Sequence, residues 1–145
     1  MDKITIISER HPLSNQQARL EDDGHSAWLY LTKENSPVVT ADAWIYNRIA
    51  APSDTEIVNF KTASPPAVSS YAHANARFTP LPSDTFEIKW SADGRSVALL
   101  INGIAFGFIP PGALRGYSRH LVKDGPWGHH WDEKLYQILF NNVNS

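Results

Sequence analysis

The sequence predicts a mainly β (α+β) fold, an antiparallel sheet of about six strands with a C-terminal meander and one short C-terminal helix. The dominant apolar spacing has a period of two, which is typical of strands whose two faces meet different surroundings. Two dipeptides that favour tight hairpin turns, Asp93-Gly94 and Asn102-Gly103, separate strand-like segments. A helical apolar spacing occurs only close to the C-terminus.

Length and composition indicate a single globular domain over residues 1–145. Of the 145 residues, 42% are hydrophobic, enough for the chain to bury a core of its own. A net charge of −2 argues against nucleic-acid binding, which usually needs a basic surface. The lack of cysteine excludes disulfides and a cysteine nucleophile and fits a reducing compartment. No apolar run approaches the roughly 20 residues of a membrane-spanning helix, and no signal-peptide pattern occurs, so we expect a cytoplasmic protein.

The N-terminal third contains three predicted strands. Residues 3–8 are rich in Ile and Thr, and residues 27–32 and 39–49 combine aromatic and β-branched residues. Residues 16–24 are polar and acidic, so we expect them to form a surface connection.

Two of these strands share a Trp-x-Tyr pattern, which places the aromatic rings of each pair on one face. Trp28 and Tyr30 form the first pair, and Trp44 and Tyr46 form the second. In an antiparallel pairing the four rings can form an aromatic ladder. This ladder is either part of the core or an aromatic-lined groove for a ligand or partner.

Residues 50–83 differ in composition from the rest of the chain. They contain five of its ten prolines, together with many Ser, Thr and Ala residues. Only residues 57–60 are strand-like, and the remainder is expected to be loop. A loop of this length in a compact domain is often functional or mobile, although a simple insertion is the alternative.

The clearest predicted unit is a three-stranded meander over residues 85–90, 96–101 and 104–109. The middle segment is apolar on both faces, which is typical of a central strand. Residues 113–122 fit neither helix nor strand clearly, because Gly116 weakens a helical interpretation.

The C-terminal helix is predicted from its start signals. Asp132 is a suitable N-cap, and the apolar residues at 135, 138 and 139 form a stripe behind it. Trp131 and Tyr136 occupy the two positions of a hydrophobic staple. We expect this helix to cover one face or end of the sheet.

Histidines are the residues most able to carry chemistry here. A metal site would need several of them to converge, but adjacent His129 and His130 should point apart on an extended chain, so we predict no metal and no other cofactor. An acid–base pair of His120 with His130, with Arg119 clamping an anion, would instead make the protein a hydrolase or nuclease-like enzyme. No nucleophile elbow or phosphate-binding loop is present, and we favour a protein without catalytic residues.

Two segments are candidates for binding a protein partner. The longest run of like charge is Glu21-Asp22-Asp23, which is either a solvated loop or a docking patch for a basic partner. The C-terminal segment collects residue types that often anchor interfaces, although Trp127 and Trp131 would alternatively pin this segment to the sheet. The candidate contact residues are Glu21, Asp22, Asp23, Tyr117, Arg119, His120, Trp127, His129 and His130.

Several short blocks stand out together along the chain. They are Glu21-Asp22-Asp23-Gly24, Ala43-Trp44-Ile45-Tyr46-Asn47, the run from Trp90-Ser91 through Asp93-Gly94 to Asn102-Gly103, Gly116-Tyr117-Ser118-Arg119, and His130-Trp131-Asp132. In order and spacing these blocks resemble a family of small bacterial proteins known only as a domain of unknown function. The resemblance covers about residues 20–135. It implies a bacterial cytosolic source but supplies no activity, substrate or catalytic residue.

We therefore expect a non-catalytic protein-binding module, and specifically a bacterial immunity protein that binds and neutralises a cognate toxin. The specific expectation rests on analogy with small, acidic, cysteine-free bacterial proteins. An acidic docking patch would suit a basic, nuclease-type toxin. The alternatives are the His-dependent enzyme and a small-ligand-binding domain that uses the aromatic sheet face, which requires a pocket of about 300 Å³ or more. We expect no nucleic-acid or membrane partner.

Overall fold

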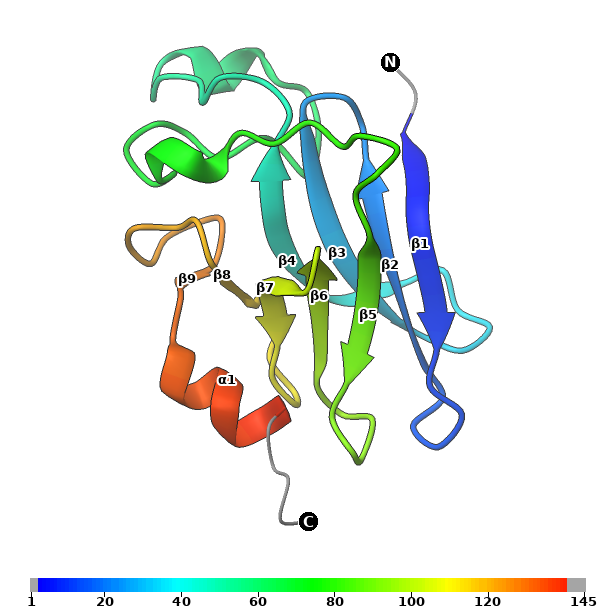
Figure 1. The fold of residues 1–145 in the computed structure, drawn as a ribbon. Helices are drawn as coiled ribbons and strands as arrows, with labels where there is room; N and C mark the ends of the chain where they lie inside the picture. The colour runs from blue at the N-terminus through cyan, green and yellow to red at the C-terminus, as the bar shows by residue number, and fades with distance from the viewer. Residues whose placement is uncertain (1–2, 141–145) are drawn as a thin grey trace.

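A computed structural model describes residues 3–140, which form two β-sheets packed face to face (Figure 1). The first sheet is an antiparallel meander in the order β1-β2-β3-β4. The second has the order β5-β6-β7-β8-β9 and is antiparallel except between β8 and β9. The strands are β1 (Ile4–Arg10), β2 (Gln16–Asp22), β3 (Ser26–Lys33), β4 (Val39–Asn47), β5 (Phe86–Trp90), β6 (Val97–Ile101), β7 (Ile104–Ile109), β8 (Tyr117–Ser118) and β9 (His129–His130).

Three short helical elements complete the described chain. They are the 3-10 turns η1 (Glu56–Asn59) and η2 (Ala74–Ala76) and the α-helix α1 (Glu133–Phe140). The mainly β class, the meander and the C-terminal helix are confirmed, but the single sheet of about six strands is replaced by sheets of four and five strands. No helix within residues 3–140 is long and apolar enough to cross a membrane.

Two local predictions were wrong. Residues 16–24 are not a surface connection, because they contain strand β2, whose Ala18 and Leu20 are fully buried. Arg19 and Glu21, on the other face of the strand, pair with each other, so a strand with one buried face has a polar sequence. The strand expected at residues 57–60 is instead the 3-10 turn η1, which buries no residue.

The main core lies between the two sheets. Alternate residues of each strand point inward, so both sheets contribute one apolar face. The largest inward side chains from the first sheet are Leu20, Leu29 and Ile45, and those from the second are Leu99, Ile101 and Ile109.

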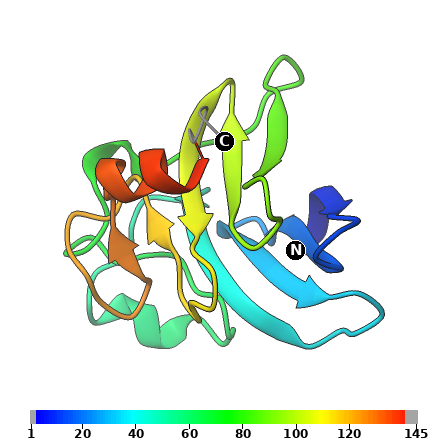
Figure 2. The same cartoon turned by 90° about the horizontal axis from the view of Figure 1, so that it is seen from below.

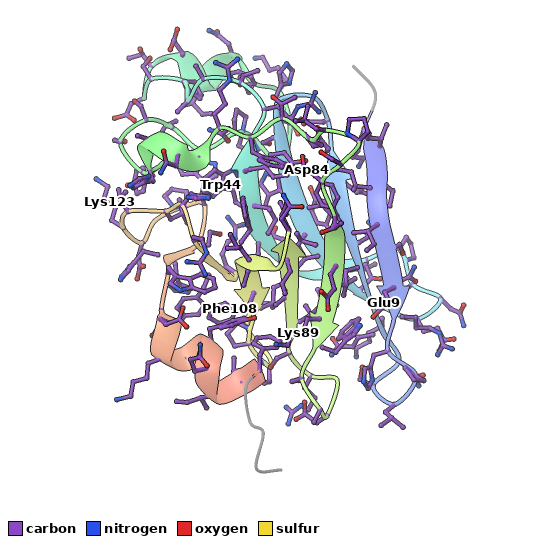
Figure 3. The ribbon with its side chains drawn as sticks, in the orientation of Figure 1. Glu9, Trp44, Asp84, Lys89, Phe108 and Lys123 are labelled. Carbon is purple, nitrogen blue, oxygen red and sulfur yellow. The ribbon has the colours of Figure 1, made fainter. Side chains whose placement is uncertain are left out.

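The outer face of the first sheet carries a second apolar cluster beneath residues 50–83. Trp28 and Trp44 lie directly opposite each other on β3 and β4 and are 3% and 0% exposed. Figure 3 shows Trp44 on the side of β4 that faces the covering loop. Tyr46 does not share this face, because a bulge in the β3–β4 pairing moves it into the main core, and the predicted four-ring ladder is therefore broken.

The outer face of the second sheet carries a third cluster, beneath helix α1. Phe108 is its centre and contacts Trp131, Tyr136 and Phe140 with ring centroids 5.2, 5.6 and 6.0 Å away. Figure 2 shows the helix lying against β7, away from the first sheet. The predicted cap is confirmed, since the Asp132 carboxylate accepts from the Leu135 N–H at 2.9 Å. The predicted staple is confirmed too, with the Trp131 and Tyr136 rings 5.3 Å apart.

The sheets also meet along one side of the sandwich, where β4 pairs with the segment before β8. The Asp42 N–H donates to the Leu114 carbonyl at 3.1 Å, and the Gly116 N–H donates to the Asp42 carbonyl at 2.8 Å. A Cβ at Gly116 would lie 2.5 Å from the Phe108 carbonyl oxygen, so this close approach needs glycine. This junction fixes where the chain enters β8 and hence where the following side chains lie.

Candidate functional site

The strongest candidate site is on the C-terminal segment, where β7, β8 and β9 lie side by side. Tyr117 pairs with Phe108 of β7 on one side and with His129 of β9 on the other. We define the C-terminal patch as Tyr117, Arg119, His129, His130 and Trp131, which are all partly or fully exposed. Two strands of two residues each therefore bring together side chains that are far apart in sequence.

Aromatic and cationic groups stack within the patch. The Tyr117 ring lies 4.9 Å from the Phe108 ring and nearly parallel to it, and 4.7 Å from the His129 ring. The Arg119 guanidinium lies 4.2 Å from the Trp131 ring centroid, and its Nε donates to the Ala105 carbonyl. These contacts hold the partly exposed side chains in fixed positions.

Asp124 organises both histidines of β9. Its Oδ1 accepts from the His130 N–H at 2.9 Å and lies 2.6 Å from His130 Nδ1, and its Oδ2 lies 3.4 Å from His129 Nδ1. The backbone hydrogen bond from His130, followed by the bond from its side chain, lowers the pKa of Asp124 to about 2. The expectation that His129 and His130 point apart was wrong, because both rings turn toward this one carboxylate.

The other histidine of the predicted enzyme site has different neighbours. The ring of His120 lies 5.1 Å from that of Phe106 and 6.3 Å from that of His73. Within residues 3–140, no hydrogen bond or ring contact joins His120 to His130, and Arg119 is stacked rather than positioned as an anion clamp. In the same range, no group of three or more His, Cys, Asp or Glu side chains is arranged to hold a metal ion. The geometry therefore does not form the predicted acid–base pair.

The acidic run is neutralised by its own surroundings. Glu21 lies 2.6 Å from Arg19 Nε and 3.3 Å from Lys3 Nζ. Asp23 accepts backbone N–H bonds from the following turn. The run is thus the end of β2 and the start of a turn, not a free acidic loop.

Asp22 is a structural residue. It is 1% exposed, and its Oδ2 accepts from the Tyr46 hydroxyl at 2.8 Å and from Arg48 Nη1 at 3.0 Å. Burial, and then the hydrogen bond to Asp22, raise the pKa of Tyr46 strongly. Asp22 therefore presents no surface for direct partner contact, which corrects its predicted role.

Trp127 is also structural. It is 7% exposed, packs in the cluster that contains Trp28 and Trp44, and donates its indole N–H to the Pro65 carbonyl at 3.2 Å. It therefore pins its segment over the first sheet, as the alternative interpretation held. The same packing covers Trp44 and most of the aromatic sheet face. The pocket that reaches Trp28 and Tyr30 at the edge of this face has a volume of about 270 Å³, which is below the size that the small-ligand alternative requires.

Sequence reasoning missed the two residues that assemble the patch. In the sequence Gly116 indicates a weak helix, but in the structure it is the close-contact position that sets β8 against β7. Asp124 was not singled out, although an acid five and six residues before adjacent histidines is a detectable signal. Comparison of the chain with protein-family models, curated proteins and solved structures gives no significant match.

Proposed function

We propose that the chain binds a protein partner through the C-terminal patch, and that it acts as an immunity protein that neutralises a cognate toxin. The observation that carries the binding proposal is the stack of Arg119 on Trp131 beside the Tyr117–His129 stack. Arg, Trp and Tyr are the side chains that most often dominate binding energy at interfaces. Because these side chains are already ordered, less conformational entropy is lost on binding.

The charge of the surrounding segment indicates the chemistry of the partner. Residues 115–131 contain three basic side chains, Arg115, Arg119 and Lys123, and one acidic side chain, Asp124. The Asp124 carboxylate is occupied by two histidines, so the outward charge of the segment is positive. The acidic residues Glu21 and Asp22 are paired internally. The arrangement therefore supports an acidic contact surface on the partner rather than the basic one expected from the sequence.

The test is quantitative binding to a captured partner. Tagged protein is used for affinity capture from a bacterial strain that carries the gene, and the purified partner is then titrated against variants by calorimetry. Arg119→Ala and Tyr117→Ala should each weaken binding by about 30-fold, the loss typical of a central interface residue. Affinity should also fall with added salt, because opposite charges face each other.

The matched control is Arg95→Ala, which removes an exposed arginine in the turn between β5 and β6. It should leave affinity unchanged, and thermal unfolding should confirm that the other two variants remain folded. Equal affinity for Arg119→Ala and Arg95→Ala would rule out this patch as the contact surface. The immunity function requires in addition that the partner alone arrests bacterial growth and that co-expression of this chain restores it. Growth arrest that persists on co-expression would contradict that function.

A further inference from the structure

We propose that a pocket at the base of residues 50–83 binds a small carboxylic acid with a short aliphatic body. The pocket has a volume of about 410 Å³ and lies where the loop meets the end of β4. Figure 1 shows this loop region beyond the arrowhead of β4, away from helix α1. None of the residues that line the pocket belongs to the C-terminal patch, so the proposal does not depend on the function proposed for that patch.

The lining of the pocket combines methyl groups with hydrogen-bond donors. Its polar side chains are those of Asn47, Ser69, His73 and Arg77, and no carboxylate lines it. The Asn47 amide is already engaged with the backbone of the loop. The remaining wall is formed by five alanines, Ala50, Ala51, Ala72, Ala74 and Ala76. Such a lining suits a ligand that has an oxyanion at one end and a small apolar body.

Two lining side chains, Arg77 and His73, carry N–H groups that suit an anion. The Nε–H of Arg77 donates to the Arg48 carbonyl at 3.3 Å. Its two Nη groups make no ion pair or hydrogen bond within residues 3–140. His73 Nδ1 accepts the Asn75 N–H at 3.0 Å, so the neutral ring carries its proton on Nε2. A carboxylate is the group whose geometry best matches a guanidinium fork.

The electrostatic surroundings favour the same charge. His120 lies next to His73, with ring centroids 6.3 Å apart. Burial, and then the nearby His73 and Arg119, lower the pKa of His120 to about 4, so its ring is neutral at pH 7. The two charged or titratable neighbours that affect the pKa of His120, His73 and Arg119, are both basic. The nearby carboxylates of Asp54 and Asp22 are engaged with Ser70 and Arg48, so an anion in the pocket would pair with Arg77.

The walls of the pocket are fixed before any ligand arrives. The fully buried Asn47 amide donates to the Ala67 carbonyl at 2.9 Å and accepts from the Ala67 N–H at 3.0 Å. The Asn47 carbonyl accepts from the Phe78 N–H at 2.8 Å, and the Ser69 N–H donates to the Pro52 carbonyl at 2.9 Å. Both sides of the pocket are therefore tied to each other or to β4, so little ordering is needed on binding.

The experiment is an NMR titration of the whole chain with butyrate at constant ionic strength, with n-butylamine and inorganic phosphate as comparison probes. Butyrate should produce saturable shifts in the amides of residues 69–77 and in the His73 ring. Arg77→Gln should weaken this binding about tenfold or more, because a charge-assisted bond is lost. Arg95→Gln, the matched loss of an exposed arginine elsewhere, should have no effect.

A second variant separates binding from folding. Ala50 is exposed and lines the pocket, so Ala50→Leu should fill part of the volume, abolish the butyrate shifts and leave thermal stability unchanged. Equal shifts with n-butylamine, stronger binding of phosphate than of butyrate, or equal affinity in the Arg77→Gln and Arg95→Gln proteins would each overturn the proposal. So would the absence of saturable shifts in the unmodified protein.

Discussion

The two sheets are each covered on their outer face, but by different kinds of chain. Residues 50–83 cover the first sheet with loop and 3-10 turns, whereas helix α1 covers the second. A helix satisfies its own backbone hydrogen bonds, so the face beneath it needs few polar partners, and the cluster around Phe108 is held by ring packing. An irregular cover must find partners for its backbone, and the first sheet supplies them through Asn47 and Ser26.

This difference explains how each cover is held. The helix is held by ring packing and is fastened at its start by the Asp132 cap. The loop is held by buried side-chain hydrogen bonds at Ala67, and the Trp127 indole adds one at Pro65. Loss of one buried polar group should therefore destabilise the whole loop cover. Loss of one ring should destabilise only the helix and its immediate neighbours.

The largest effect is expected for Asn47→Ala. The change leaves the Trp44 indole N–H and both backbone groups of Ala67 buried without partners. We expect a loss of about 3–5 kcal/mol in the free energy of unfolding, measured by urea denaturation. Asn59→Ala, an exposed change in the same loop, should stay within about 0.5 kcal/mol. A loss below about 1 kcal/mol at Asn47 would contradict the idea that polar anchoring holds this cover.

A smaller and more local effect is expected for Tyr136→Ala in helix α1. The ring is 8% exposed and packs against Phe108 and Trp131, so its removal leaves a cavity at the edge of the molecule. We expect a loss of about 2–3 kcal/mol. Amide hydrogen exchange should accelerate in residues 133–140, while β2 and β3 keep their protection. Equal acceleration in β3 would show that the helix cover is not a separate unit.

The smallest effect concerns pH and Asp124, the exposed anchor of the segment that carries Trp127. Its folded-state pKa of about 2 lies below the ordinary value of 3.8. A lowered folded-state pKa means that the stabilisation is fully present above about pH 4 and is lost as the pH falls through the folded-state value. The His130 amide shift should therefore titrate near pH 2, and this step should be absent in Asp124→Asn. A midpoint near pH 4, or an unchanged titration profile in Asp124→Asn, would contradict the role of the Asp124 carboxylate in holding His130.

Much of the helix-covered half could be predicted from sequence, because its signals are local. The turn residues Asp93-Gly94 and Asn102-Gly103 adopt positive φ at both glycines and at Asn102, and the helix start depends on residues within one turn of Asp132. The loop-covered half could not, because its determinants act over long sequence distances. Asn47 bonds Ala67, which is 20 residues away, and nothing near Asn47 identifies that partner.

The same distinction applies to the candidate site. Residue types alone identified Tyr117, Arg119, His129 and His130, because aromatic and basic residues are concentrated there. They did not reveal that His120 has other neighbours, or that Trp127 and Asp22 are buried. Tyr117 and His129 pair in parallel because residues 119–128 bring the chain back beside β8. The local sequence does not specify the path of that connection.

The backbone contacts of β4 affect whether molecules of this protein can associate edge to edge. An outermost strand with free N–H and C=O groups is a template for a strand from another molecule. The backbone of β4 is engaged at two places, by residues 114–116 at Asp42 within the strand and by Phe78 at its last residue, Asn47. A second molecule would have to displace both contacts before it could extend the sheet there, so this side of the sandwich is protected against runaway strand addition.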